Sequence, residues 1–259
     1  MTVTIFSCVC ACRSARVHLG SSTMVWIKPQ DSRWPSSSNI ETVGCLNLVR
    51  TLCTFSPFFG LLGVSIIPFY HLYFCIAFEA QLYRKLPCPC DGVTEMLWFG
   101  REKTFNVMVM ELLGKSLADL FEACGRRFSL PTVIFIALES LRRIENLHNH
   151  DIVHRDIKPN NFVIGKEPNA NTVYLLDYGL AKIYRIHSTH IPYREDKKLT
   201  GTARYASLNA HLGRELSRRD DLESLGFMLV CFYKGNLPWQ GNHNAKTKQE
   251  MYTAIKKVK

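Results

Sequence analysis

The sequence is poor in acidic residues, with 22 Asp and Glu against 32 Lys and Arg in 259 residues and a net charge of +10. Hydrophobic residues make up 47% of the chain, enough for a folded domain with a sizeable core. Basic proteins bind nucleic acids, membrane surfaces or acidic substrates. No zinc-finger, RNA-recognition or homeodomain signature occurs in the sequence, so nucleic acid is not an expected partner. The charge favours acidic or phosphorylated protein partners.

The ten cysteines lack the paired spacing of a metal site or a disulfide framework. Eight of them lie in residues 1–90, and only two follow. Cys88-Pro-Cys90 has no second pair, which a structural zinc site would require. We therefore expect reduced thiols in an intracellular protein, with acylation of the cluster Cys8, Cys10 and Cys12 as an alternative.

Residues 51–78 contain no Asp, Glu, Lys or Arg. Their length would let them cross a bilayer as a helix. Two prolines, two glycines and several polar residues in this stretch count against that interpretation, so membrane attachment is an alternative and not the favoured one. A signal peptide is not expected, because the first residues lack a basic region and the apolar run begins too late. A cytoplasmic or nuclear location is expected.

The sequence does contain a compact group of charged and amide residues, His154-Arg155-Asp156-Ile157-Lys158-Pro159-Asn160-Asn161. Phosphoryl transfer to a hydroxyl needs a carboxylate (Asp156) to accept a proton, an amine (Lys158) to neutralise the migrating group and a carboxamide (Asn161) to hold a metal ion. The apolar run at residues 173–176 then leads to Asp177-Tyr178-Gly179, which supplies a second metal-binding carboxylate. A charged loop before a strand would not explain these offsets.

Apolar spacing predicts the elements around these motifs. Strands are expected over residues 96–99, 105–112 and 173–176, whereas residues 1–50 show no sustained period. No internal repeat is present. Helices are expected over residues 77–86, 116–124 with Ser116 as N-cap, 130–148, 221–232, and in the basic stretch that ends at Lys259.

These motifs resemble those of the eukaryotic protein kinases, and more narrowly those of the casein kinase 1 family. Most protein kinases have Ala-Pro-Glu after the activation segment, whereas casein kinase 1 proteins have a motif similar to Ser207-Leu208-Asn209. Tau-tubulin and vaccinia-related kinases share only parts of the pattern. The resemblance covers about residues 76–253 and implies an α+β, bilobal protein-kinase-like fold with a mostly helical large lobe. It rests on residues 174–185 (YLLDYGLAKIYR), 190–195 (HIPYRE) and 199–227 (LTGTARYASLNAHLGRELSRRDDLESLGF).

The resemblance implies a role for each matching residue. Asp156 would be the catalytic base and Lys158 would lie beside the γ-phosphate. Asn161 and Asp177 would hold Mg²⁺, and Glu79 matches the glutamate of helix αC. Residues that would bind the adenine of ATP are Met110, at the back of its pocket, and Glu111 and Leu113, through their backbone groups.

Three further positions follow from the same resemblance. Asp221 matches the aspartate at the start of helix αF, which receives backbone N–H groups of the catalytic loop. Arg204 matches an arginine that helps to bind a phosphate already on the substrate, a role that suits a planar bidentate donor. The family's partner lysine aligns here with Glu250 or Met251, and an acid there would repel a phosphate.

The sequence before Glu79 lacks the glycine-rich loop whose backbone amides approach the phosphates of ATP. Val25-Trp26-Ile27-Lys28 resembles the strand that carries the ATP lysine, but Lys28 lies 51 residues before Glu79, far more than the family interval. Lys28 is therefore not expected to be that lysine. We expect residues 1–75 to be a non-family, irregular and apolar segment. Residues 76–114 would be the remnant of an incomplete β-rich small lobe, and residues 115–259 a large lobe truncated after helix αF.

The expected function is that of a monomeric serine/threonine kinase that uses ATP and Mg²⁺ to phosphorylate acidic or pre-phosphorylated proteins. Without the glycine loop and its lysine, we expect activity at least about a hundredfold below that of an intact relative. One alternative is a catalytically impaired kinase-like module that binds partners, and another is a membrane-tethered form. Family members continue for several helices after the Leu-Pro-Trp-Gln-Gly run, so a splice fragment or a misassembled gene model is also expected.

Overall fold

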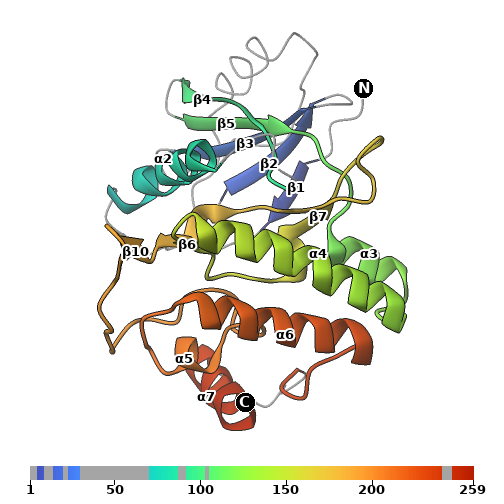
Figure 1. Ribbon diagram of the computed structural model, residues 1–259, viewed down its shortest axis with the longest axis vertical. Coiled ribbons are helices and arrows are strands. Elements are labelled where there is room, and N and C mark those ends of the chain that lie inside the picture. The colour runs from blue at the N-terminus through green and yellow to red at the C-terminus, as the bar shows by residue number, and fades with distance from the viewer. Residues whose placement is uncertain are drawn as a thin grey trace. The chain divides into compact units, whose positions relative to one another are not determined.

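The computed structural model describes residues 5–8, 14–19, 23–29, 70–86, 92–102, 105–240 and 247–259 (Figure 1). The chain forms two compact units. One contains the described residues up to Leu86 together with Thr94–Leu113, and the other contains Gly92, Val93 and Gly114–Lys259. The first unit is built on a β-sheet, and the second is mostly helical.

The first unit has an antiparallel five-stranded sheet in the order β1-β2-β3-β5-β4. The strands predicted over residues 96–99 and 105–112 are confirmed as β4 and β5. The prediction that residues 1–75 are irregular is wrong where they form β1, β2 and β3. The reason is a long-range ladder, because β3 pairs with β5 along seven residues, from Thr23 opposite Glu111 to Pro29 opposite Phe105. The strands are β1 (Ile5–Cys8), β2 (Ser14–Leu19), β3 (Thr23–Pro29), β4 (Met96–Glu102) and β5 (Phe105–Glu111).

Helix α2 (Tyr70–Lys85) packs against β4 and β5. It begins seven residues before the predicted start, within the apolar stretch that was considered as a membrane span. Ile76, Ala80 and Tyr83 are buried in this unit, as is usual for apolar residues on one face of a helix that packs on a sheet. Among the described residues, none of the helices combines the length and the hydropathy that crossing a bilayer would need. Residues 51–69 lie outside the described part of the chain.

The second unit confirms the helices predicted from the sequence in that region. Ser116 begins the first of them in a capping box, in which its hydroxyl accepts from the Asp119 amide while the Asp119 carboxylate accepts from the Ser116 amide. Helices α4 and α6 pack side by side (Figure 1). The helices are α3 (Leu117–Ala123), α4 (Leu130–Asn149), α5 (Leu208–His211), α6 (Arg218–Lys234) and α7 (Lys248–Val258).

An aromatic cluster joins α3, the turn after it and α6. The ring centroids of Phe121, Phe128 and Phe232 lie 5.0–5.3 Å apart in tilted and edge-to-face arrangements. All three side chains are buried, and burying a phenylalanine contributes roughly 1.5–3 kcal/mol. This cluster fixes α6 in the core, which matters because the N-terminus of α6 reaches the loop that carries the phosphoryl-transfer motif.

Short antiparallel ladders place that motif. Residues 154–161 connect β6 to β7, and Asp177 lies two residues after the end of β8. Two 3₁₀ turns, η1 (Pro159–Asn161) and η2 (Tyr178–Leu180), lie at the ends of the two motifs. The paired strands are β6 (Ile152–Val153) with β9 (Lys182–Ile183), β7 (Phe162–Ile164) with β8 (Val173–Leu175), and β10 (Arg185–Ile186) with β11 (Thr189–His190).

Candidate active site

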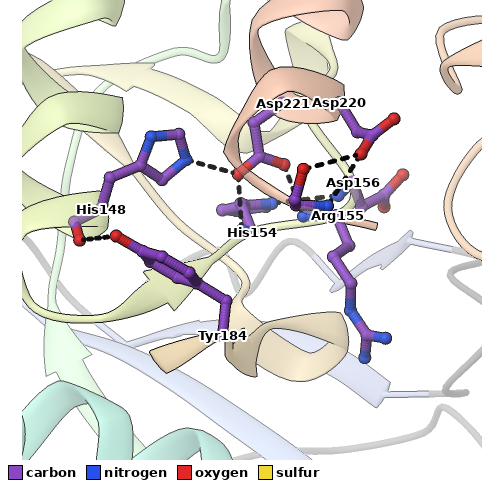
Figure 2. Close-up of polar contacts among 8 residues, drawn as sticks. His148, His154, Arg155, Asp156, Tyr184, Asp220 and Asp221 are labelled. Atoms are coloured by element: carbon purple, nitrogen blue, oxygen red, sulfur yellow. Dashed lines mark hydrogen bonds and ion pairs between the residues drawn. The ribbon is translucent and has the colours of Figure 1, made fainter. Parts of the chain in front are cut away.

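The loop at residues 154–161 is held from helix α6 by one buried carboxylate. Asp221, in the first turn of α6, accepts hydrogen bonds from the backbone amides of His154 and Arg155, both at 2.8 Å (Figure 2). It also lies 2.8 Å from Nε2 of His148 on α4. Three donors therefore converge on one carboxylate that is 1% exposed. The expected contact between Asp221 and the loop amides is confirmed.

Asp156 has a fixed side-chain orientation. One carboxylate oxygen, Oδ1, accepts hydrogen bonds from both the amide and the hydroxyl of Thr202, each at 2.8 Å. The other oxygen, Oδ2, lies 2.5 Å from the ammonium of Lys158. Both the Asp156 and the Lys158 side chains are buried. The structure thus brings together the carboxylate and the amine that the motif predicted to act on one phosphoryl group.

Thr202 was not among the residues singled out from the sequence. It follows Gly201, which has a φ of +88°, a value that side chains rarely tolerate. A Cβ atom at Gly201 would lie only 2.5 Å from the carbonyl oxygen of Arg155. The glycine therefore lets the two loops approach closely enough for Thr202 to reach Asp156. No local sequence pattern predicts this contact, which joins residues 46 positions apart.

Asn161 is fully buried, and its two side-chain atoms differ in their contacts. The amide nitrogen donates to the carbonyl of Asp156 at 2.9 Å, whereas the oxygen Oδ1 is buried without a protein partner. The Leu176 amide donates to the Asn161 carbonyl at 2.8 Å, continuing the β7–β8 ladder. Asp177, the next residue, is thereby brought beside Asn161 along the backbone and adopts the left-handed conformation, with φ 68° and ψ 72°.

His154 links the two motifs through its ring. Its Nδ1 accepts from the Asp156 amide at 3.2 Å, and its Nε2 lies 3.1 Å from the Leu176 carbonyl. These contacts fit the tautomer with the proton on Nε2. The ring also meets Tyr178 edge to face, with centroids 5.7 Å apart. Tyr178 is buried and donates its hydroxyl to the carbonyl of Leu175 at 2.9 Å, so the tyrosine packs as expected in place of phenylalanine.

Comparison with known families decides the identity of this arrangement. A family model described as the protein kinase domain matches residues 75–259, well over half of the chain. The chain belongs to the protein kinase family. Kinases of this family generally use ATP and Mg²⁺. The strands β1–β3 lie before the matched residues.

The residues of this kinase fit a hard cation. Mg²⁺ prefers oxygen ligands such as carboxylates and amide carbonyls. The orphaned Oδ1 of Asn161 is such an oxygen, and a buried polar atom without a partner costs about 1–3 kcal/mol unless a ligand satisfies it. The carboxylate of Asp177, two residues after the end of β8, would supply the charge. Asn161 and Asp177 thus offer oxygen atoms of the kind that Mg²⁺ prefers.

The residues predicted to bind ATP away from the loop motif lie in the first unit, whereas Arg204 lies in the second. Glu79 is buried on α2, and Met110 is buried on β5. Glu111 ends β5 and donates its amide to the Glu95 carbonyl at 3.1 Å, and Leu113 is buried just after it. Lys28 lies on β3, where its backbone is paired with Asn106 of β5.

A charged cluster follows the loop motif in the second unit. Arg155 donates through Nε to the Leu180 carbonyl at 2.6 Å, and burial lowers the pKa of its guanidinium despite the attraction of Glu215 and Asp221. Burial alone would raise the pKa of Glu215, but hydrogen bonds from Lys182 and Lys197 outweigh it and hold that pKa below its usual value. The ion pairs of Lys182 and Lys197 with Glu215 connect β9 to the segment just before α6.

Proposed function

We propose that this kinase is a serine/threonine kinase of casein kinase 1 type, which transfers the γ-phosphoryl group of ATP to hydroxyls of acidic or pre-phosphorylated proteins. The observation that carries the proposal is the Asp156 carboxylate, held by Thr202 on one oxygen and by Lys158 on the other. A general base needs this kind of fixed orientation toward the attacking hydroxyl.

In this mechanism, Asp156 takes the proton of a substrate hydroxyl as the hydroxyl oxygen bonds to the γ-phosphorus and ADP leaves. Lys158, paired with the same carboxylate, carries positive charge beside the migrating phosphoryl group. His154 and Asp221 hold the backbone of the loop, so that neither group has to reorganise during transfer. Glu79 would act from helix α2, and Met110, Glu111 and Leu113 would bind the adenine.

Asn161 and Asp177 would hold Mg²⁺, which when bound neutralises charge on the phosphate oxygens. We expect Asn161→Ala to raise the Mg²⁺ concentration needed for half-maximal activity by at least about tenfold, since even second-shell losses at metal sites cost roughly 10–100-fold in affinity. Initial rates over a Mg²⁺ titration at saturating ATP measure this. Asn149→Ala, on the exposed end of α4, is the matched control. An unchanged Mg²⁺ dependence in Asn161→Ala would remove Asn161 from the metal site.

The Ser207-Leu208-Asn209 motif supports the narrower assignment to casein kinase 1. The Ser207 hydroxyl and the Asn209 amide donate to the same oxygen of buried Asp220, at 2.7 and 3.0 Å. Ser207 also caps α5 by accepting from the Ala210 amide at 3.1 Å. The motif thus anchors the segment before α5 to the start of α6.

Two features bear on the proposed substrates. Arg204 is exposed, as a residue that binds a substrate phosphate has to be. Glu250, in the first turn of α7, carries a negative charge where the family pattern has a lysine nearby. We therefore expect acidic proteins to be used, and pre-phosphorylated ones to gain less from their phosphate than they would with a complete basic pocket.

The test is transfer of label from γ-labelled ATP to casein and to serine, threonine and tyrosine peptides of matched acidity, using the full chain with Mg²⁺. Label on serine and threonine alone supports the proposal. A nucleotide-dependent rise in melting temperature without any transfer would instead support the kinase-like binding module. Label on tyrosine would contradict the serine/threonine assignment.

Strand β3 supports a role for Lys28 that the sequence interval argued against. The V-x-I-K pattern, which carries the phosphate-binding lysine in kinases, lies here on the strand beside β5. We expect Lys28→Met to lower kcat/KM by about a hundredfold, a loss of nearly 3 kcal/mol of transition-state stabilisation. Steady-state kinetics with ATP as the varied substrate measure this, with the exposed Lys85→Met on α2 as control. Equal values of kcat/KM in Lys28→Met and Lys85→Met would show that Lys28 does not bind the phosphates of ATP.

A further inference from the structure

The turn that carries Arg204 is held through its backbone carbonyls. Within this turn, residues 202–206, the Thr202 carbonyl accepts from the amides of Tyr205 and Ala206, both at 2.9 Å. Three other carbonyls of the turn accept from side chains that lie far along the chain. The indole Nε1 of Trp239 donates to the Arg204 carbonyl at 2.7 Å. The ammonium of Lys259 donates to the carbonyls of Ala203, at 3.2 Å, and of Ala206.

The Lys259 ammonium also sits against two aromatic rings. Its nitrogen lies 4.7 Å from the ring centroid of Phe227 and 4.8 Å from that of Trp239. The two rings meet edge to face, with centroids 4.9 Å apart. A cation over ring faces is attracted by the negative charge of their quadrupoles. The half-buried ammonium of Lys259 therefore contacts two carbonyl oxygens and two aromatic rings, which the ammonium of a solvent-exposed lysine would not do.

We propose that Lys259 is a positioning residue, whose ammonium locks the Arg204 turn in the conformation that presents Arg204 to a phosphate or carboxylate on the substrate. With the carbonyls of the turn directed at Lys259 and Trp239, the Arg204 side chain stays exposed. Thr202, at the start of the turn, has its own bonds to Asp156. Loss of Lys259 therefore loosens substrate binding and leaves the catalytic base in place. The inference rests on the proposed kinase function.

The charge of Lys259 changes within an accessible pH range. Burial lowers the pKa of Lys259 to about 8, and the charge of Glu223 on α6 only partly opposes this. His211 on α5 lies 3.4 Å from the Lys259 nitrogen and 3.0 Å from the same Ala203 carbonyl. Burial lowers the pKa of His211, the hydrogen bond to Ala203 opposes this, and the charges of Lys259 and Lys256 lower the pKa further. His211 is therefore neutral from neutral pH upward. The ammonium is present below about pH 8 and is lost above it, so the lock weakens as the pH rises through that value.

The experiment compares Lys259→Met, Lys259→Arg and the control Lys257→Met, whose side chain is exposed in the last turn of α7. Peptide KM and kcat are measured at saturating ATP over about pH 6.5–9.5 with an acidic, pre-phosphorylated peptide. We expect Lys259→Met to raise the peptide KM by about tenfold at neutral pH, with kcat within twofold and no pH dependence of KM. The KM of the unsubstituted chain should climb toward that value above pH 8, whereas Lys259→Arg should keep a low KM throughout, because guanidinium stays charged.

A second measurement does not depend on kinase activity. An arginine-specific protease should cleave after Arg204 several times faster in Lys259→Met than in Lys257→Met, because opening of the turn exposes the bond. Faster cleavage with no phosphate transfer by any variant would support the lock and overturn the proposed function. Equal cleavage rates, an equal peptide KM in the two methionine variants, or a fall in kcat with unchanged KM would overturn the lock. Melting temperatures within a few degrees confirm that all variants fold.

Discussion

Asp156→Asn is expected to lower kcat for phosphate transfer by roughly 10²–10⁴-fold, the range that a positioned general base contributes. The amide has nearly the shape of the carboxylate but cannot accept the proton of the attacking hydroxyl. It also turns an NH₂ group toward either Thr202 or Lys158, both of which are donors at present. The ATP KM should change little, since the substitution leaves the adenine-binding residues untouched. Initial rates with labelled ATP and an acidic peptide measure the effect.

Asp196→Asn is the matched control, because this residue is exposed and lies in the same unit. Its φ of 59° suits asparagine as well as aspartate, so the substitution should leave the backbone unchanged. Both variants should melt within a few degrees of the unsubstituted chain. Retention of more than about a tenth of the original turnover in Asp156→Asn would exclude Asp156 as the base.

Asp221→Ala is expected to give the largest loss of stability, about 3–5 kcal/mol, which is typical when one partner of a buried charged contact is removed. The substitution leaves the amides of His154 and Arg155 and the ring of His148 without their acceptor. At roughly 2–4 °C per kcal/mol for a domain of this size, the melting temperature should fall by about 6–20 °C. Urea unfolding followed by circular dichroism measures the free energy directly.

Glu145→Ala on the exposed side of α4 removes a carboxylate of similar size and serves as control. It should change the free energy of unfolding by less than about 0.5 kcal/mol, as surface substitutions usually do. The Asp221 variant should also lose kinase activity at temperatures where it is still folded, because the loop then lacks two of its backbone anchors. An Asp221→Ala protein as stable as the control would show that water replaces the carboxylate without cost.

The sequence motifs identified the centre of the candidate site because those residues are close in the chain. Asp156, Lys158 and Asn161 lie within one loop, and the structure joins them by hydrogen bonds over two and five positions. The partner of the base could not be found this way. Thr202 reaches Asp156 only because Gly201 allows two distant loops to touch, and such contacts depend on the fold as a whole.

The first three strands show where local periodicity failed. In β2, Ala15, Val17 and Leu19 alternate with polar residues, and the sequence between β2 and β3 contains Gly20. This is a hairpin signal, but runs of four to seven residues are too short to outweigh the lack of a pattern over residues 1–50. The strand conformation of β3 is stabilised by its pairing with β5, about eighty residues later, which the local sequence does not predict.

The start of helix α2 was mispredicted for a different reason, although the helix itself was expected. Its first half has no charged residue, and such composition is shared by membrane spans and by helices that cover a sheet. Contact with β4 and β5 distinguishes the two interpretations, and that contact is tertiary. The contacts of the Lys259 ammonium likewise have no sequence signature, because the carbonyls and rings that surround it come from three separate segments of the chain.

The left-handed backbone of Asp177 restricts what evolution or engineering can place there. Glutamate would keep the negative charge but would have to adopt a φ of 68°, which longer side chains rarely do. Asparagine and glycine accept that backbone yet bring no charge. Aspartate alone satisfies both demands, so a charge-preserving replacement and a shape-preserving replacement at this position are different experiments, and neither is conservative.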